Sequence, residues 1–219
     1  MKKQLILLFF MLSGPSCSAQ NLIFRVGGGW ASRYDNDTRV IGAFKIGLGY
    51  EIELNGMWSV EPGVLYFAKG WKHKDRVVTI YDEQGKPVYD ADGNVRTGKM
   101  NVTSNADYIE VPVLFNYYIV LGQPHYLKLS AGPYAAYGAG GKTKTYGDTK
   151  QSGAARFFYD QPTFKLAGMH RFDAGIVAVV GYEFNRKVDA GINVDFGLVN
   201  INNERRKNFA VVLSLAYKI

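Results

Sequence analysis

The sequence predicts an all-β fold, and three observations support this. The 219-residue chain contains 15 tyrosines, 13 phenylalanines and 25 glycines, a composition that suits strands and tight turns better than helical bundles. Apolar and polar residues alternate with a period of two in eight segments. Short connections between these segments alternate with long ones. Together these observations predict an eight-stranded antiparallel transmembrane β-barrel.

The start of the chain predicts export from the cytoplasm. Residues 1–19 are expected to be a signal peptide and residues 20–219 a single barrel domain, because two early lysines precede the apolar run 5–12 and small residues that end at Ala19. A lipoprotein alternative at Cys17 stays open, although the residues before it fit a lipid-attachment site poorly. Removing this segment lowers the formal charge from +7 to +5 and leaves no cysteine for disulfides, metal binding or catalysis.

Alternation is clearest at the C-terminus. In residues 209–219 the apolar face includes Val211, Leu213 and Leu215, whereas Ser214 and other small or polar residues occupy the opposite face. The seven other predicted strands are residues 22–30, 42–54, 57–69, 108–119, 126–138, 172–184 and 188–199. Their second face is rich in glycine, small residues and isolated charges, which suits a narrow barrel lumen better than the water-facing side of a soluble sandwich.

The connections predict how the barrel is oriented. The short ones are 55–56, 122–124 and 185–187, and the long ones are about 31–39, 71–106, 139–169 and 200–207. Short periplasmic turns and long extracellular loops are typical of barrels in the bacterial outer membrane, with both termini on the periplasmic side. The longest connection contains two turn signals, at 84–85 and 92–94.

One strand carries a resemblance to a known family. Residues 108–117, with the sequence YIEVPVLFNY, resemble a YxEIPxLxxY strand of the PorT-like outer-membrane β-barrel family of Bacteroidetes-type bacteria. Residues 61–70 and 213–219 agree with it, whereas the final Ile219 departs from the phenylalanine that ends many such barrels. The resemblance implies an outer-membrane barrel without specifying an activity, and a role in assisting a secretion machine is an expectation drawn from it.

Charged residues on the inner faces predict a filled lumen. Eight strands enclose just enough space for side chains, and a buried charge without a partner is costly, so these residues are expected to form ion-paired networks. The set is Arg25, Lys45, Glu51, Glu61, Lys69, Glu110, Lys128, Asp173, Glu183, Asp189 and Asp195, and Lys218 shares their face. A proton or ion path through the same residues is the alternative.

The long loops carry an excess of positive charge. Lys142, Lys144, Arg205, Arg206 and Lys207 are candidate contacts to the phosphates of an anionic lipid such as lipopolysaccharide. The alternative is that these residues are simply solvated. We expect the lipid bilayer as the main partner, and neither nucleic acid nor nucleotide.

The leading functional prediction is a non-enzymatic outer-membrane protein, without cofactor or metal, whose long loops mediate surface or secretion-machinery interactions. A relaxed phosphate-loop pattern at 136–143 lacks the helix that such a loop needs. Two other classes stay open. One is a soluble periplasmic β-barrel that binds a small apolar ligand, and the other is an outer-membrane lipid-modifying enzyme using His170, Asp173 and a serine such as Ser152, although no nucleophile motif supports it.

Overall fold

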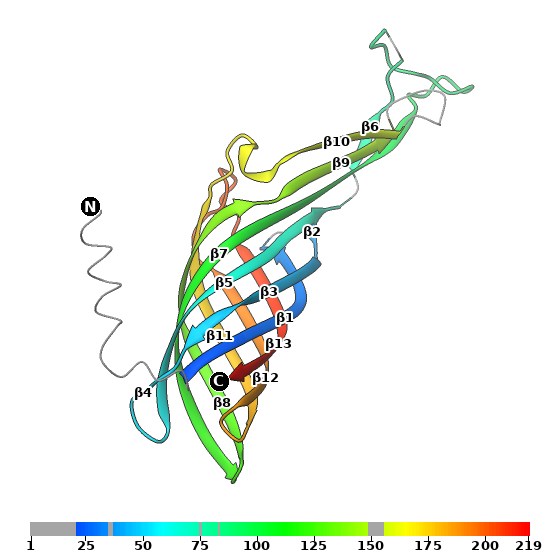
Figure 1. Cartoon of the computed structure of the whole chain (residues 1–219). Coiled ribbons are helices and arrows are strands. Elements are labelled where there is room, and N and C mark those ends of the chain that lie inside the picture. Colours follow the sequence, from blue (N-terminus) through cyan, green and yellow to red (C-terminus); the bar gives the residue numbers. More distant parts are fainter. Residues whose placement is uncertain (1–20, 35–36, 75, 83, 149–155) are drawn as a thin grey trace, which may run out of the picture.

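A computed structural model describes residues 21–34, 37–74, 76–82, 84–148 and 156–219, so the predicted signal peptide 1–19 lies outside the described residues. Within these described ranges thirteen strands form one sheet (Figure 1). They are β1 (Leu22–Arg33), β2 (Thr38–Arg39), β3 (Ile41–Tyr50), β4 (Ile52–Glu53), β5 (Trp58–His73), β6 (Arg76–Thr79), β7 (Thr97–Gly122), β8 (His125–Gly140), β9 (Lys142–Asp148), β10 (Arg156–Pro162), β11 (Phe172–Phe184), β12 (Val188–Gly197) and β13 (Asn208–Lys218), with a 3-10 helix η2 (Thr163–Lys165) before β11. No helix in these ranges is long and apolar enough to cross a membrane.

Eight of the strands close into a ring. The antiparallel order is β1, β3, β5, β7, β8, β11, β12 and β13, and β13 pairs with β1 again. The closing ladder runs from Ile23 opposite Lys218 to Arg33 opposite Asn208. Closure satisfies every strand edge within the ring, as the hydrocarbon of a bilayer requires. The predicted eight-stranded antiparallel barrel is confirmed.

The apolar faces of the barrel strands point outward. In β13, Leu213 and Leu215 are 65 % and 58 % exposed, whereas Val212 and Ser214 between them are buried. Such an outer surface is stable only against lipid. The alternative of a soluble barrel with an apolar ligand is therefore wrong, because its apolar faces would have to line the interior.

Three short turns lie at the same end of the barrel as the start of β1 and the end of β13. The turns are residues 54–57, Gln123-Pro124 and 185–187, all at the lower end in Figure 1. At the same end the amide of Ile219 donates to the carbonyl of Leu22 at 2.9 Å. By the rule for outer-membrane barrels this is the periplasmic side, as predicted.

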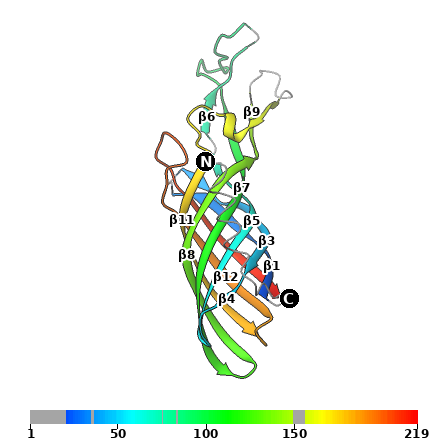
Figure 2. The same ribbon diagram turned by 60° about the vertical axis from the view of Figure 1, so that its left-hand side comes forward.

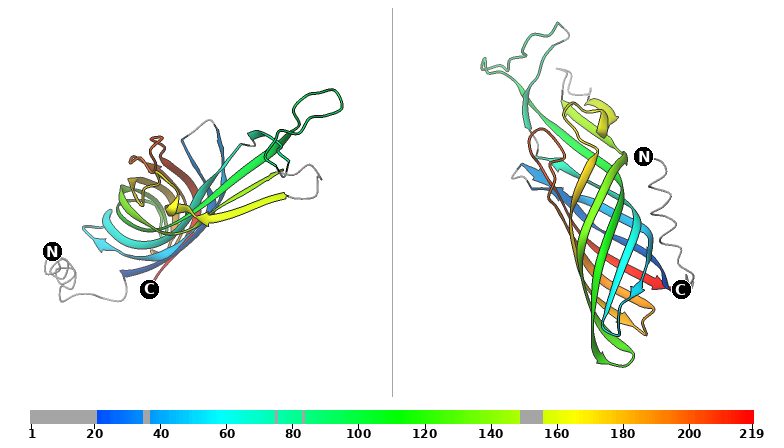
Figure 3. Two further views of the ribbon diagram at one scale, coloured as in Figure 1. Left: turned by 90° about the horizontal axis from the view of Figure 1, so that it is seen from above. Right: turned by 90° about the vertical axis from the view of Figure 1, so that its left-hand side faces the viewer.

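The opposite end projects well beyond the ring (Figure 2). β7 has 26 residues, and its first part pairs with β6 and then with the β9–β10 hairpin. The ladder between β7 and β8 shifts register between Asp107 and Tyr108, and such an irregularity bends a strand. The extension lies to one side of the barrel when viewed from above (Figure 3). The sequence predicted long connections in this region, one of them with a hairpin signal at 84–94, but it did not predict that β7 continues beyond the barrel.

The two turn signals in the β6–β7 connection do form turns. The amides of Gly85 and Gly93 donate to the carbonyls of Asp82 and Asp90 at 3.1 and 3.2 Å. The Asp90 carboxylate also accepts hydrogen bonds from the backbone amides of Asn94 and Asp92, at 2.8 and 3.0 Å. These bonds hold the pKa of Asp90 below its usual value, the Asn94 amide contributing most.

Candidate functional site

The eleven residues of the expected lumen network all lie inside the barrel, and none is more than 4 % exposed. They fall into two groups at different heights. The lower cluster, near the short turns, contains Arg25, Glu51, Glu61, Lys128, Glu183 and Asp189, together with Lys218 and Arg186. The upper cluster, nearer the long loops, contains Lys45, Lys69, Glu110, Asp173 and Asp195.

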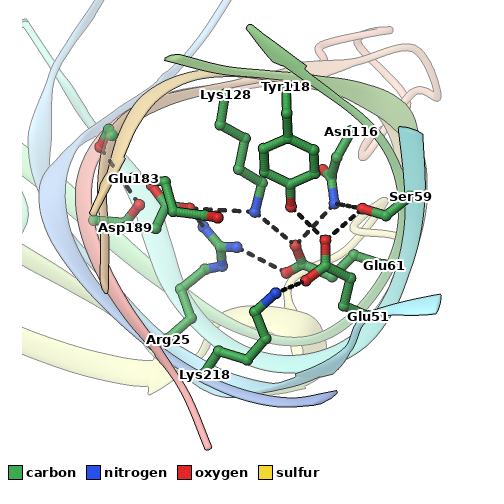
Figure 4. A network of polar contacts seen from close by, with 12 residues as sticks. Arg25, Glu51, Ser59, Glu61, Asn116, Tyr118, Lys128, Glu183, Asp189 and Lys218 are labelled. Atoms are coloured by element: carbon green, nitrogen blue, oxygen red, sulfur yellow. Dashed lines mark hydrogen bonds and ion pairs between the residues drawn. The ribbon is translucent and has the colours of Figure 1, made fainter. Parts of the chain in front are cut away.

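Four charges of the lower cluster form a ring (Figure 4). Glu61 accepts from Arg25 Nη2 at 2.7 Å and from Lys128 Nζ at 3.0 Å. Asp189 Oδ2 lies 3.3 Å from Lys128 Nζ and 3.8 Å from Arg25 Nη1. Cations therefore alternate with carboxylates from β1, β5, β8 and β12, and each charge faces two of opposite sign.

Glu51 connects this ring to neutral polar side chains. Its Oε1 accepts hydrogen bonds from the hydroxyls of Tyr118 and of Ser59, the latter at 2.6 Å. The amide of Asn116 donates to Ser59 Oγ at 3.0 Å and to Glu61 Oε2 at 3.4 Å. These bonds satisfy carboxylate oxygens that would be costly to leave buried without partners.

Arg186 covers the lower mouth of the barrel. It lies in a short turn, in the left-handed region with φ 55°, and its guanidinium is 3.8 Å from the centre of the Tyr118 ring. It also approaches Glu53 at 3.2 Å and Glu183 at 3.9 Å. The sequence predicted the turn but not this contact, since nothing local indicates that a turn residue folds back under the barrel.

Two lysines organise the upper cluster. Lys45 Nζ lies 2.7 Å from Asp195 and 3.0 Å from Glu110. Lys69 Nζ lies 2.9 Å from Asp173 and 3.8 Å from the second oxygen of Glu110. The cluster thus joins β3, β5, β7, β11 and β12 through Glu110, which faces both lysines.

Aromatic rings surround these lysines. Lys45 Nζ is 4.3 Å from the centre of the Phe67 ring, and Lys69 Nζ is 4.7 Å from Tyr108 and 5.2 Å from Tyr134. Such cation–π contacts are strongest where water is excluded. These three aromatics were missed as site residues, although the period-two alternation places all of them on the inner face.

Apolar side chains separate the two clusters. Leu65, Leu114, Val177 and Val212 are each at most 6 % exposed. The space that borders both clusters has a volume of about 10 Å³, which is room for about one water molecule. The lumen is therefore filled at this height by packed side chains.

The cationic residues of the long loops occupy two elements. Lys142 and Lys144 lie on β9, where Lys142 pairs with Asp160 at 3.1 Å. Arg205, Arg206 and Lys207 lie in the β12–β13 connection, where Arg206 is 3.8 Å from Glu204. The two sets come from separate parts of the rim, and the structure does not join them into one site.

Of the residues considered for a lipid-modifying enzyme, the two that the structure describes, His170 and Asp173, have different partners. The ring of His170 interacts with the carbonyl of Asn200 at 3.1 Å, whereas Asp173 lies in the upper cluster, bound by Lys69 and Asn208. Ser152 lies outside the described residues. The phosphate-loop pattern at 136–143 is the end of β8 and the start of β9, with no helix after it.

A cavity of about 320 Å³ lies at the mouth, beyond the upper cluster. Its floor includes Trp71 and Arg33, whose guanidinium lies 4.2 Å from the centre of the Trp71 ring. The other lining residues are His73, Arg76, Val102, Ser104, Thr143, Thr145, Gln161, Leu166, Ala167, Gly168, Met169, Asn202, Asn203 and Glu204. The sequence did not predict this cavity, because its wall combines residues of six strands, β1, β5, β6, β7, β9 and β10, with two connections far apart in the chain.

The closed ring, its lipid-facing surface and its buried charges define a transmembrane β-barrel. The chain belongs to the family described as outer membrane protein beta-barrel domain, whose model matches residues 19–203. It is accordingly a protein of the bacterial outer membrane. No curated protein is detectably similar to the chain in sequence.

Solved structures provide looser comparisons. The attachment invasion locus protein Ail of Yersinia pestis is 11 % identical, with a TM-score of 0.43 over 91 % of this chain and 99 % of that chain. Neisserial surface protein A is 14 % identical, with a TM-score of 0.44 over 92 % and 98 % of the two chains. Overlaps at these TM-scores are loose, so the family assignment rests on the family model.

Proposed function

We propose that the chain is a non-enzymatic outer-membrane protein whose closed barrel holds an extracellular interaction surface, and that residues 1–19 are removed on export. The observation that carries this proposal is the filled lumen. Two ion-paired clusters occupy it, and the space that borders both is about 10 Å³. A lumen without room for a hydrated solute favours a structural role for these charges over an ion path.

The partner side is the end with the long connections. β6, the first part of β7, β9 and β10 form a sheet that stands beyond the ring, and a partner at the cell surface or in a secretion machine would meet this sheet. The PorT-like resemblance supports the barrel architecture more strongly than it supports a partner in a secretion machine. Its motif residues Tyr108 and Glu110 point into the lumen and belong to the polar network, so these two positions of the motif describe how the barrel is filled.

The cations of the rim are proposed to contact lipopolysaccharide phosphates. Lys142 is 64 % exposed and lies outside the barrel mouth on β9, and Arg205 is exposed in the β12–β13 connection. Exposed aromatics such as Tyr137 and Trp30 lie on the lipid-facing surface, where aromatic rings favour the membrane interface. Lys144, Arg206 and Lys207 complete the set as further donors to the same kind of phosphate.

Single-channel recording in planar bilayers tests the closed lumen. The full mature chain should insert without discrete current steps, whereas Arg25→Ala/Lys128→Ala, which removes both cations of the lower ring, should give small, measurable conductance. The matched control is Lys142→Ala/Lys144→Ala, two cations removed outside the lumen, which should stay silent. Regular conductance by the unaltered chain would contradict the proposal, provided that heat-dependent gel mobility shows all variants folded.

The absence of enzymatic activity is tested through His170. Under the proposal, His170→Ala leaves the lipid A composition of the producing cells unchanged, because this ring is engaged with a backbone carbonyl and has no nearby carboxylate partner among the described residues. Mass spectrometry of extracted lipid A provides the measurement. A modified lipid A species that depends on His170 would establish the enzymatic alternative instead.

A further inference from the structure

The cavity at the mouth has a wall that is fixed in place. Six strands, β1, β5, β6, β7, β9 and β10, supply most of the wall, including Trp71, Ser104, Thr143 and Thr145, and the rest comes from the connections around 166–169 and 202–204. At about 320 Å³ its volume falls at the lower end of the range for small-molecule sites, which is about 300–1,000 Å³. The cavity therefore fits one small ligand and is larger than a single ion needs.

Backbone hydrogen bonds tie the two connections together over the mouth. The amide of Asn203 donates to the carbonyl of Gly168 at 3.0 Å, and the amide of His170 donates to the carbonyl of Ile201 at 2.9 Å. Gly168 has φ +78°, and a Cβ there would lie 2.9 Å from the Asn203 side-chain nitrogen. The close approach requires glycine, and it holds the Asn203 amide at the rim of the cavity.

Neutral hydrogen-bonding groups dominate the polar part of the lining. Thr143 and Thr145 face the cavity while Lys142 and Lys144 on the same strand face away from it, as alternation along a strand dictates. Thr143 Oγ1 donates to Ser104 Oγ at 2.9 Å. Hydroxyls and amides that both donate and accept suit a ligand carrying several hydroxyl groups.

Charge distinguishes one side of the cavity. Arg33 is stacked on Trp71, with its Nη2 3.2 Å from His73 Nε2, and Arg76 lines the same side. Among the described residues that line the cavity the one carboxylate is that of Glu204, which lies 3.8 Å from Arg206. Guanidinium groups recognise planar carboxylates and phosphates by paired hydrogen bonds, so the lining favours an anionic group at this end of a ligand.

We propose that the cavity binds an acidic saccharide, a hydroxylated ring that carries a carboxylate or phosphate. The anionic group lies toward Arg33 and Arg76, and the ring hydroxyls meet the threonine and asparagine side chains. This inference rests on the proposed function in that the mouth opens outside the cell. The saccharide has two sources, the sugar part of lipopolysaccharide in the same membrane or a free acidic glycan.

Tryptophan fluorescence of the full mature chain in detergent micelles provides the test. Trp30 and Trp58 are 62 % and 44 % exposed on the lipid face, whereas Trp71 is 1 % exposed in the cavity floor. In a Trp30→Phe/Trp58→Phe background the remaining indole reports on the cavity alone. Titration with galacturonate should give a saturable change, and galactose, its uncharged counterpart, should bind about tenfold more weakly or worse, as expected for loss of a charge-assisted contact.

Matched variants separate a site from general attraction. Arg76→Gln and Thr145→Val should each weaken galacturonate binding severalfold, whereas Lys144→Gln, the adjacent outward-facing residue, should not change it. Competition by purified lipopolysaccharide would identify the membrane as the source, and galacturonate binding without such competition would identify a free glycan.

Four outcomes would overturn the proposal. These are no fluorescence change with galacturonate, equal binding of galactose, equal binding of inorganic phosphate, or an effect of Lys144→Gln as large as that of Thr145→Val. Heat-dependent gel mobility checks that each variant is folded. The bilayer recordings do not involve the cavity. Failure of the fluorescence titration would therefore leave the closed-lumen proposal intact, and conductance in the bilayer recordings would leave the saccharide proposal intact.

Discussion

The two charged clusters of the lumen balance their charges in different ways. The lower cluster has four cations and four carboxylates, namely Arg25, Lys128, Arg186 and Lys218 with Glu51, Glu61, Glu183 and Asp189. The upper cluster has three carboxylates for two lysines, and it adds aromatic faces around the lysines. In the lower cluster a ring gives each of four charges two partners of opposite sign. In the upper cluster each lysine has its own aspartate, and Glu110 is the one carboxylate that both lysines share.

This difference sets how much each cluster depends on one residue. Glu61 and Asp189 each face both Arg25 and Lys128, so one cation remains when the other is removed. Among the described residues, the ion pair of Asp195 is with Lys45 alone. Because an uncompensated buried charge costs far more than a lost contact, the upper cluster should be the more sensitive one.

The largest effect is expected for Lys45→Met. The change leaves Asp195 and one oxygen of Glu110 without their cation in a buried site, and we expect the free energy of unfolding to fall by about 3–5 kcal/mol. Reversible urea unfolding in lipid vesicles, followed by tryptophan fluorescence, measures it. Adding Asp195→Asn should recover part of the loss, and a loss under about 1 kcal/mol for the single variant would remove the distinction between the clusters.

A smaller effect is expected for Lys128→Met in the lower cluster. Arg25 still lies 2.7 Å from Glu61 and 3.8 Å from Asp189, so the loss should be about 2 kcal/mol, the scale of one hydrogen bond to a charged group. The same unfolding measurement applies. Combining it with Arg25→Met should cost more than the two single losses added together, and simple additivity would count against redundancy.

The smallest effect is expected for Arg186→Ala at the lower mouth. Its guanidinium is partly exposed, and it contributes a cation–π contact with Tyr118 and a pair with Glu53, so we expect a loss of about 1 kcal/mol. This loss should shrink at high salt, whereas that of Lys45→Met should not, because exposed pairs are screened and buried ones are not. Equal salt dependence in both variants would contradict this ranking by exposure.

Alternation along the sequence was enough to predict the barrel and its inner charges. In a strand the side of each residue follows from its parity, so Arg25, Lys45 and Glu110 could be placed in the lumen without coordinates. Which charges meet could not be predicted, since Lys45 and Asp195 are 150 residues apart and their contact depends on the tilt and stagger of the closed ring.

The projecting sheet escaped prediction for a different physical reason. The projecting part consists of residues 97–107 of β7 together with β9, and it lies beyond the lipid. Because these segments do not have one apolar and one polar face, their sequence shows no period-two signal. Trp71 and Tyr108 were missed for a related reason. Aromatic residues near strand ends usually lie on the outer face, at the membrane interface. Only the odd or even position of Trp71 and Tyr108 along their strands indicates that these two side chains point inward.

The continuity of β7 has a mechanical consequence. Its 26 residues extend roughly 80 Å, from the periplasmic turn through the upper cluster to the outermost pairs with β6 and β9. A strand needs only about ten residues to span the bilayer. The remaining residues of β7 therefore set the height of the outer sheet above the membrane. A load applied at the tip of this strand therefore passes along one covalent chain into the barrel wall.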